Sequence, residues 1–207
     1  MLQLKTIDPD TYLLLQQLSE SDYLKDFALA GGTSLALQLG HRISIDLDFF
    51  TREVFDSLEL LEKLEADYEL SNVTTAKNSL SLYIFFNKKN IKVEFLRHNY
   101  KQLNNFLINN DISLYSIEDI AAMKLNAIAN RGAKKDFFDI YELLKTYPIT
   151  DLLDLFKEKY VSQNAFTVIK SLNYFIDADK EPDPMNLKTV SWNQVKERIK
   201  SEVNKNF

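Results

Sequence analysis

The sequence contains no cysteine, which excludes disulfide bonds, thiolate metal ligands and a cysteine nucleophile. Its two histidines, His41 and His98, are too few and too badly placed for a zinc site. No apolar run approaches the roughly 20 residues that a membrane-spanning helix needs. The start, MLQLKTIDPD, lacks the cationic and then apolar pattern of a secretory signal. These absences favour a cytoplasmic protein with no membrane segment.

Positive charge is also scarce, because 25 Lys and Arg residues face 30 Asp and Glu residues and leave a net charge of −5. Nucleic-acid-binding proteins are more often basic overall, so the charge does not indicate one. A local patch can still bind phosphates on an acidic protein. A hydrophobic content of 45% with 27% charged residues is typical of folded globular proteins, and 207 residues fit one compact domain or two small ones.

Hydrophobic patterning predicts a mixed α/β first half followed by a helical second half. Strands are expected at 27–31, 45–50, 68–75, 80–86 and 91–97, and the last three are joined by the polar breaks AKNS and NKKN, as hairpin loops would be. Helices are expected at 10–25, 33–39, 57–67, 116–130, 134–145, 150–160 and 164–175. The proline-bearing stretch 177–186 is linker-like and precedes a short C-terminal helix from SWNQVKERIKSEV.

Glycine is rare, and three of the four glycines lie in LAGGTSLALQLGHRISIDLDFF, residues 29–50. A strand ending in Gly31 and Gly32 and running into a helix at Thr33 brings several backbone N–H groups to one point. A phosphate can approach such a backbone closely, and the helix dipole favours its negative charge. The hydroxyls of Thr33 and Ser34 add donors. The alternative is a plain tight turn in which Thr33 is the helix N-cap.

The same stretch places two aspartates one residue apart in an apolar run. Residues two apart on a strand point the same way, so Asp46 and Asp48 are expected to share one face. Ile45, Leu47 and Phe49 would then face the core. Two like charges a few ångströms apart repel unless a cation lies between them, and Mg²⁺ is held by a few carboxylates together with phosphate oxygens. An exposed pair without a function is the alternative.

A third carboxylate is offered by IKVEFLRH, in which Glu94 is expected to face away from the core together with Lys92. Two-metal phosphoryl-transfer sites commonly use such a group to bridge the metals or to act as a base. The strand of Glu94 is the last before the helical half and could neighbour the strand of Asp46. A solvated glutamate without a role is the alternative.

These motifs together resemble the nucleotidyltransferase toxins of the abortive-infection AbiEii type, a type IV toxin–antitoxin family of the polymerase-β-like nucleotidyltransferase superfamily. The resemblance is carried by GGTSLAL, HRISIDLDFF, IKVEFL and AAMKLNAIANRGAKKDFFDIYELL, and it covers residues 27–144. It implies an α+β fold with a nucleotidyltransferase core of about five mixed strands and flanking helices at 1–100. A helical bundle at 101–207 would pack on this core.

The resemblance also implies roles for individual residues. Asp46 and Asp48 would bind the divalent metal, Mg²⁺ or Mn²⁺, with Glu94 as a less fixed third ligand. The nucleoside triphosphate (NTP) would be bound by the glycine turn, by an arginine that precedes the aspartates in the family pattern together with Ser44, and by a helix lysine. These nucleotide-binding residues would be Gly31, Gly32, Thr33, Ser34, Arg42 and Lys124, and Asp136 would be the downstream catalytic aspartate.

Lys124 can also be weighed without the resemblance, since it would lie within an apolar helical stripe. Lysines avoid such positions, because burying an ammonium without a partner costs several kcal/mol. It is interpreted as a lysine that reaches a triphosphate, and a lysine snorkelling from the edge of the stripe is the alternative. Asp136 could be an ordinary first-turn acid. Asp139 is interpreted as a structural partner of Lys135 or Arg131.

The sequence therefore predicts a metal-dependent nucleotidyltransferase that moves a nucleoside monophosphate from an NTP to an acceptor hydroxyl. The resemblance suggests an RNA end, such as the 3′ end of a tRNA, growth arrest in toxin–antitoxin or phage-defence systems, and a cognate antitoxin protein. Arg131, Lys134 and Lys135, with the lysines of FNKKNIK, are the candidates for holding RNA. Two alternatives stay open: an enzyme that nucleotidylates protein side chains, and a non-catalytic nucleotide-binding module on the same fold.

Overall fold

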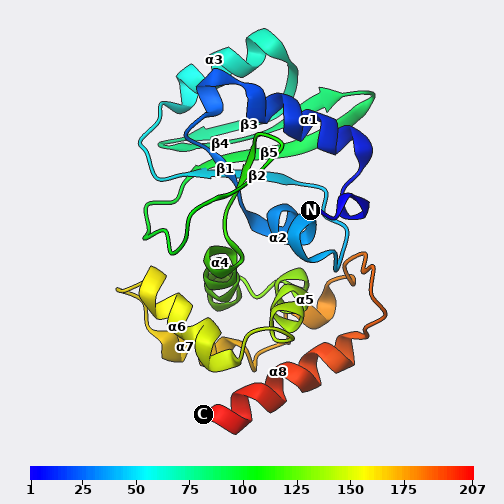
Figure 1. Cartoon of the computed structure of the whole chain (residues 1–207), viewed down its shortest axis with the longest axis vertical. Helices are drawn as coiled ribbons and strands as arrows, with labels where there is room; N and C mark the ends of the chain where they lie inside the picture. Colours follow the sequence, from blue (N-terminus) through cyan, green and yellow to red (C-terminus); the bar gives the residue numbers. More distant parts are fainter. The chain divides into compact units, whose positions relative to one another are not determined.

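The computed structural model describes residues 1–207, and the chain divides into two compact units. The first unit comprises Met1–Gly40, Ser44–Tyr100 and Phe106–Tyr115. The second comprises His41–Ile43, Lys101–Asn105 and Ser116–Phe207. All of the strands belong to the first unit, and the second unit is helical (Figure 1).

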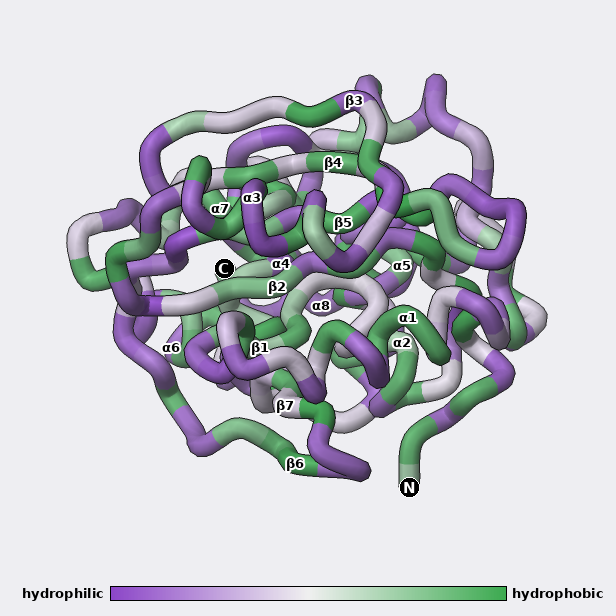
Figure 2. Tube along the Cα trace, turned by 90° about the horizontal axis from the view of Figure 1, so that it is seen from above, coloured by the Kyte–Doolittle hydropathy of each residue, from purple (hydrophilic) through white to green (hydrophobic).

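The first unit is built on one mixed sheet of seven strands in the order β3-β4-β5-β2-β1-β7-β6 (Figure 2). The β2–β5 and β1–β7 pairs are parallel, and the other pairs are antiparallel. The expected α+β fold with a mixed sheet is confirmed, including the two hairpins that join β3, β4 and β5. The strands are β1 (Ala28–Leu29), β2 (Leu47–Thr51), β3 (Glu69–Ala76), β4 (Ser79–Phe86), β5 (Lys89–Arg97), β6 (Leu107–Asn109) and β7 (Ile112–Leu114).

Two strands were missed, since about five were predicted and seven are present. The missing strands, β6 and β7, form a hairpin of three residues on each side. Its two-residue turn is Asn110-Asp111, and both residues have positive φ, 48° and 61°. Three residues are too few to display an alternating pattern, so periodicity carries no signal there.

Helices cover both faces of the sheet. Figure 1 shows α1 (Pro9–Glu20) and α3 (Ser57–Asp67) on one face and α2 (Gly31–Leu39) on the other. Short 3-10 turns occupy Leu4–Thr6 and Asp22–Leu24. The main core lies beneath α1 and α3, where leucines of these helices meet the apolar face of the central strands. This core includes Leu14, Leu15, Leu18, Leu60, Leu64, Leu47, Phe49, Val93 and Phe95. The opposite face of β2 and β5 is therefore the one that carries their polar residues.

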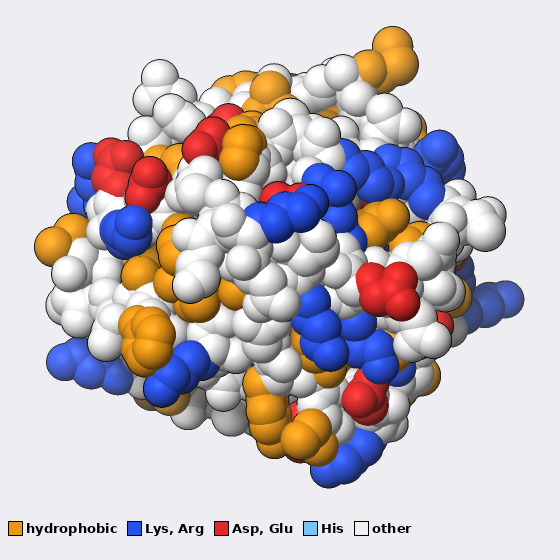
Figure 3. Space-filling model, turned by 90° about the horizontal axis from the view of Figure 1, so that it is seen from below, with side chains coloured by type: hydrophobic (Ala, Val, Ile, Leu, Met, Phe, Trp, Pro, Cys, Tyr) orange, Lys and Arg blue, Asp and Glu red, His pale blue; other side chains and the backbone are white.

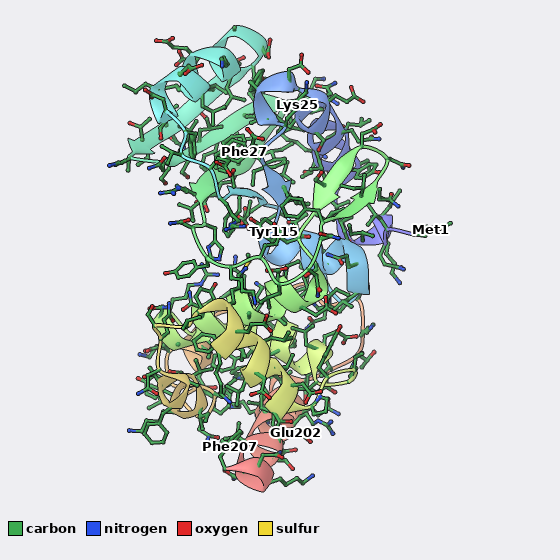
Figure 4. All side chains as sticks on the ribbon, turned by 60° about the vertical axis from the view of Figure 1, so that its left-hand side comes forward. Met1, Lys25, Phe27, Tyr115, Glu202 and Phe207 are labelled. Atoms are coloured by element: carbon green, nitrogen blue, oxygen red, sulfur yellow. The ribbon has the colours of Figure 1, made fainter.

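The second unit contains α4 (Ile117–Asn130), α5 (Lys134–Leu143), α6 (Ile149–Lys159), α7 (Ala165–Ser171) and α8 (Trp192–Asn206), with a 3-10 turn at Ala178–Lys180. The predicted helices are present, and their ends differ by a few residues. α8 begins with a capping box: the Ser191 hydroxyl accepts a hydrogen bond from the backbone N–H of Gln194, and the Gln194 side chain accepts one from the backbone N–H of Ser191. In Figure 4, Tyr115 marks the end of the first unit, and Glu202 and Phe207 lie on and just after α8. None of the helices combines the length and apolar character that crossing a membrane requires.

A buried ion pair fastens the second unit internally. The Asp119 carboxylate of α4 lies 2.6 Å from Lys159 Nζ of α6, and neither side chain is exposed. The same carboxylate accepts hydrogen bonds from Leu103 N (3.0 Å) and from the Ser116 hydroxyl (2.8 Å). Lys159 also donates to the carbonyl oxygen of Lys101 (2.8 Å). Every polar atom of this pair therefore has a partner that compensates for its burial.

Candidate functional site

The glycine turn and the aspartate strand meet in the first unit. α2 begins at Gly31, two residues before the predicted start, and its N-cap is Ala30, which has no capping side chain. Gly31 has a φ of +64°, and a Cβ added there would lie 2.1 Å from Oδ2 of Asp48. The backbone N–H of Ala30 donates to the carbonyl oxygen of Asp48 (2.7 Å). Only glycine can therefore occupy position 31 while Asp48 keeps this place.

The hydroxyls next to the glycine turn face inward. Thr33 and Ser34 are fully buried. The Thr33 hydroxyl donates to the carbonyl oxygen of Asp46 and lies 2.9 Å from Ser44 Oγ. The alternative that Thr33 is the N-cap is therefore wrong, because Ala30 takes that position. Both hydroxyls are buried and cannot reach a ligand. The groups that the turn can offer a phosphate are therefore its backbone N–H groups.

The three predicted carboxylates lie on or beside two adjacent strands. Asp46 directly precedes β2, Asp48 lies within it, and Asp48 is in register with Glu94 of the parallel strand β5. The expectation that these strands could be neighbours is thus confirmed. All three carboxylate residues are half-buried, whereas Leu47 and Phe49 are in the core. The expectation that Ile45 faces the core was wrong: it is 59% exposed, because β2 starts only at Leu47.

A lysine that the sequence analysis did not assign to the site lies among these carboxylates. Lys92 Nζ is 2.6 Å from Oε1 of Glu94, and the Ser81 hydroxyl lies 3.2 Å from the same oxygen. The hydrogen bond to Glu94 raises the pKa of Lys92 above its usual value, and the charges of Asp46 and Asp48 add to this effect. One ammonium group is thus attracted by three carboxylates.

The chemistry of these carboxylates suits a divalent cation. As they stand, no three of the chain's Asp, Glu and His side chains are arranged as a ready metal site. Half-buried carboxylates on adjacent strands are, however, the hard oxygen donors that Mg²⁺ and Mn²⁺ take. The donor set fits such an ion with Asp46, Asp48 and Glu94 as ligands. Their metal role stays a prediction.

The remaining predicted residues belong to the second unit, where they form a buried ion network. Lys124 Nζ lies 2.8 Å from Asp136 Oδ1 and 2.7 Å from Asp139 Oδ2. Only 6% of the Lys124 side chain is exposed, so this lysine does not snorkel to solvent. Burial alone would lower its pKa, but the charges of Asp136 and Asp139 outweigh burial and raise it. The ammonium therefore stays charged inside the unit.

Asp139 is the centre of this network. Its Oδ1 is 2.7 Å from Nε of Arg42 and 2.7 Å from Nε2 of His41, and its Oδ2 is 2.9 Å from Arg42 Nη2. Arg42 thus binds the carboxylate through two nitrogens, in the bidentate geometry that Arg favours. Burial would raise the pKa of Asp139, but Arg42 and Lys124 hold it well below its usual range. The interpretation that Asp139 pairs with Lys135 or Arg131 missed these partners.

The predicted basic patch is only partly on the surface. Arg131 is exposed and pairs with Asp136 at 3.1 Å, and Lys135 is exposed. Lys134 is buried: its ammonium bonds to the Glu181 carbonyl oxygen and lies 3.1 Å from Asp183. The expectation that Lys134 is available to RNA was therefore wrong. In FNKKNIK, Lys92 is paired with Glu94, and Lys89 with Asp8 and Asp10.

Comparison with known proteins identifies the chain. The family model described as "Nucleotidyl transferase AbiEii toxin, Type IV TA system" matches residues 13–206, nearly the whole sequence. The chain belongs to this family. The resemblance stated from its motifs is confirmed, and so is its class, a nucleotidyltransferase.

A sequence relative and two solved structures also match most of the chain. An uncharacterized protein of Aquifex aeolicus (strain VF5) is 40% identical over 162 residues, 75% of this chain and 77% of that protein. The crystal structure of JHP933 from Helicobacter pylori superposes with a TM-score of 0.59 at 16% identity, covering 96% of this chain and 92% of that one. A second Helicobacter pylori structure gives the same TM-score at 17% identity, with coverages of 93% and 89%. These structures share the fold of this AbiEii-family chain.

Proposed function

We propose that this chain moves a nucleoside monophosphate from an NTP to a hydroxyl at an RNA end, and that it acts as a toxin. One observation carries the proposal: the carboxylate of Asp48 lies against the backbone of Gly31 at the start of α2 and in register with Glu94. A helix N-terminus and a set of carboxylates are thereby joined in one unit. That combination suits a polyphosphate that is bound together with a divalent cation.

The start of α2 would hold the phosphates of the nucleotide. The first turn of a helix leaves N–H groups without partners inside the helix, and the helix dipole favours negative charge there. Ala30 has no side chain that could cap the helix, so the N-cap residue does not compete with a phosphate for these donors. The absence of side chains at Gly31 and Gly32 lets a phosphate come close. Thr33 and Ser34 would act indirectly, by fixing the turn.

Asp46, Asp48 and Glu94 would hold the divalent cation. When bound, the cation neutralises triphosphate charge and makes the acceptor hydroxyl a better nucleophile. In the transfer, the acceptor oxygen bonds to the α-phosphorus, the bond from that phosphorus to the bridging oxygen breaks, and pyrophosphate leaves with the electron pair. A carboxylate beside the acceptor would take the proton of the hydroxyl. Of the three, Asp48 is the one whose carboxylate lies against Gly31 at the start of α2.

Arg42, Lys124 and Asp136 would take part as a charged network of the second unit. Each of them is buried, and their ion pairs join residues of this network to one another. A lysine or arginine that is ion-paired with an aspartate can bind a leaving phosphate only if it first breaks that ion pair. Their first role is therefore to position the chain around His41–Ile43, which ends three residues before Asp46.

An RNA acceptor fits the charge of the second unit better than that of the first. The second unit holds 16 Lys and Arg residues against 14 Asp and Glu residues, whereas the first holds nine against 16. On the face drawn in Figure 3, Lys and Arg side chains gather in several groups. Exposed Lys170 lies 4.5 Å from the ring of Phe166, and Lys200 5.5 Å from that of Phe175. Both lysines can bind phosphates, and the exposed ring of Phe166 can stack on a base, whereas Phe175 is buried.

The deciding experiment is incubation with each labelled NTP, Mg²⁺ and total cellular RNA, followed by separation of RNA from protein. Label on RNA that disappears in Asp46→Ala supports the proposal. Label on protein would support the side-chain nucleotidylation alternative instead, and no label with tight NTP binding would support a binding module. Sequencing of labelled RNA ends would show whether tRNA 3′ ends are the acceptors.

RNA binding by the second unit has its own test. Binding of tRNA should weaken steeply with salt, and Lys170→Ala with Lys200→Ala should reduce that salt dependence. Lys25→Ala, an exposed lysine of the first unit, is the matched control and should change nothing. A flat salt response would count against an RNA acceptor.

The toxin role is tested in cells. Expression of the chain should arrest growth, Asp46→Ala should remove the arrest, and a cognate antitoxin protein should restore growth when it is expressed together with the active chain. Arrest that persists with Asp46→Ala would separate toxicity from nucleotidyl transfer and contradict the proposal.

A further inference from the structure

Lys92 is placed where a cation is needed. Lys92 and Glu94 are two residues apart on β5, so they share a face, and Glu94 is in register with Asp48 of β2 on one side and with Ser81 of β4 on the other. The Lys92 ammonium is 2.6 Å from Glu94 Oε1. The same face thus carries acidic groups of two strands and one ammonium.

The pair contributes little to stability. The Lys92 side chain is 34% exposed and that of Glu94 is 38% exposed, so water screens their attraction. Such a pair can break at small cost when a better partner arrives. The buried pairs of the second unit differ, since breaking one of them would leave a charge without compensation. Lys92 therefore has the properties of an exchangeable partner.

Without Lys92, the carboxylates would repel one another. The field of Asp46 and Asp48 reaches the Lys92 ammonium and adds to the hydrogen bond from Glu94 in raising its pKa. The ammonium thus partly compensates three negative charges, as a bound cation would.

We propose that Lys92 is the resident counter-ion of the carboxylate face and competes with the divalent cation for Glu94. The inference rests on the proposed metal site of Asp46, Asp48 and Glu94. When the cation binds to Glu94 Oε1, it repels the ammonium that is bonded to the same oxygen, so Lys92 gives up this bond and moves away. Lys92 thereby sets the metal concentration that the enzyme requires.

The test is titration of the full-length chain with Mn²⁺ alone, followed by calorimetry or by the electron paramagnetic resonance of unbound Mn²⁺. Lys92→Met should lower the Kd for Mn²⁺ about 3- to 10-fold, because one opposing charge is removed at close range. Lys92→Arg should keep the wild-type Kd. An unchanged or higher Kd in Lys92→Met would overturn the inference.

Two further variants separate local competition from a general change of charge. Lys89 lies on the same strand and pairs with Asp8 (2.8 Å) and Asp10 (2.7 Å), so Lys89→Met removes an equal charge from a different carboxylate pair. It should leave the Kd unchanged. In a Glu94→Gln background, Lys92→Met should tighten Mn²⁺ binding less than it does in the wild type. Equal effects of Lys89→Met and Lys92→Met would overturn the competition.

The outcome also distinguishes this inference from the proposed function. Asp48→Asn should raise the Kd for Mn²⁺ at least about tenfold. If Asp48→Asn weakens binding and Lys92→Met changes nothing, only the role of Lys92 is wrong. If Asp48→Asn leaves binding untouched, the proposed metal site fails and the inference fails with it.

Discussion

The two units hold their acidic groups in opposite ways. In the first unit, Asp46, Asp48 and Glu94 are half-buried, and Lys92 is bonded to Glu94 at the surface. In the second unit, Asp136 and Asp139 are fully buried and bind Lys124, Arg42, Arg131 and His41. The difference teaches which carboxylates can change partners. A buried charge must keep its compensating partner, whereas a half-buried one can exchange its partner for a ligand.

The largest effect is expected from the buried network. Asp139→Asn removes the charge that compensates Arg42 and Lys124, and breaking a buried pair costs about 3–5 kcal/mol. The free energy of unfolding, from urea denaturation, should fall by that amount. Asp154→Asn, which breaks the exposed pair with Lys157, is the matched control and should change little. Equal losses in the two variants would remove the distinction between buried and exposed carboxylates.

Asp48→Asn should lower activity and leave stability nearly unchanged. The rate of label transfer should fall about 100-fold or more, because a proposed metal ligand is lost. The urea midpoint should stay near that of the wild type, since the carboxylate is half-buried and a neutral amide of the same size can replace it. Asp26→Asn, an exposed aspartate of the same unit, is the control and should keep full activity. A strong loss of stability with normal activity would contradict the assignment.

Two glycines sharpen the comparison. Gly31 and Gly132 both have positive φ, +64° and +57°, so an alanine costs about 1–2 kcal/mol of strain at either position. Only at Gly31 does the new Cβ meet a proposed metal ligand, Asp48 Oδ2 at 2.1 Å; at Gly132 the nearest atom is 3.6 Å away. Gly31→Ala should therefore lower activity about 10- to 100-fold by displacing Asp48. Gly132→Ala should lose similar stability and keep its activity.

The smallest effect concerns acid. The pKa of Asp139 is held well below its usual range by Arg42 and Lys124 against the opposing effect of burial. A carboxyl group whose folded pKa is depressed contributes stability above its unfolded pKa, about 3.9, and loses that contribution as pH falls toward the folded pKa. The stability gap between wild type and Asp139→Asn should be constant from about pH 8 to 5 and should shrink below about pH 4. A gap that grows in acid would contradict this.

The sequence predicted the parts of the fold and site that local patterns determine. Alternation placed Leu47 and Phe49 inside and Asp48 outside, and it put Glu94 on the polar face of its strand. The glycine turn and the helix that follows were predicted within two residues. The motifs were sufficient to identify the family, because each motif is a short stretch whose residue types and spacing can be read directly from the sequence.

What could not be predicted depends on distant partners. Asp139 bonds to His41 and Arg42, which lie 98 and 97 residues away in the sequence, and no periodicity reports such a contact. Lys134 is buried because its ammonium bonds to residues 181 and 183, across 47 and 49 residues. Lys92 gave a weak signal, since its position two residues before Glu94 already put both side chains on one face.

The most direct test of the contrast between the units is Mn²⁺ binding measured side by side in Asp48→Asn and Asp139→Asn, at a temperature where both variants are folded. The account predicts that Asp48→Asn weakens binding at least about tenfold at unchanged stability, and that Asp139→Asn keeps the wild-type Kd while it loses stability. Wild-type Mn²⁺ binding in Asp48→Asn, or its loss in folded Asp139→Asn, would contradict the placement of the metal on the half-buried carboxylates.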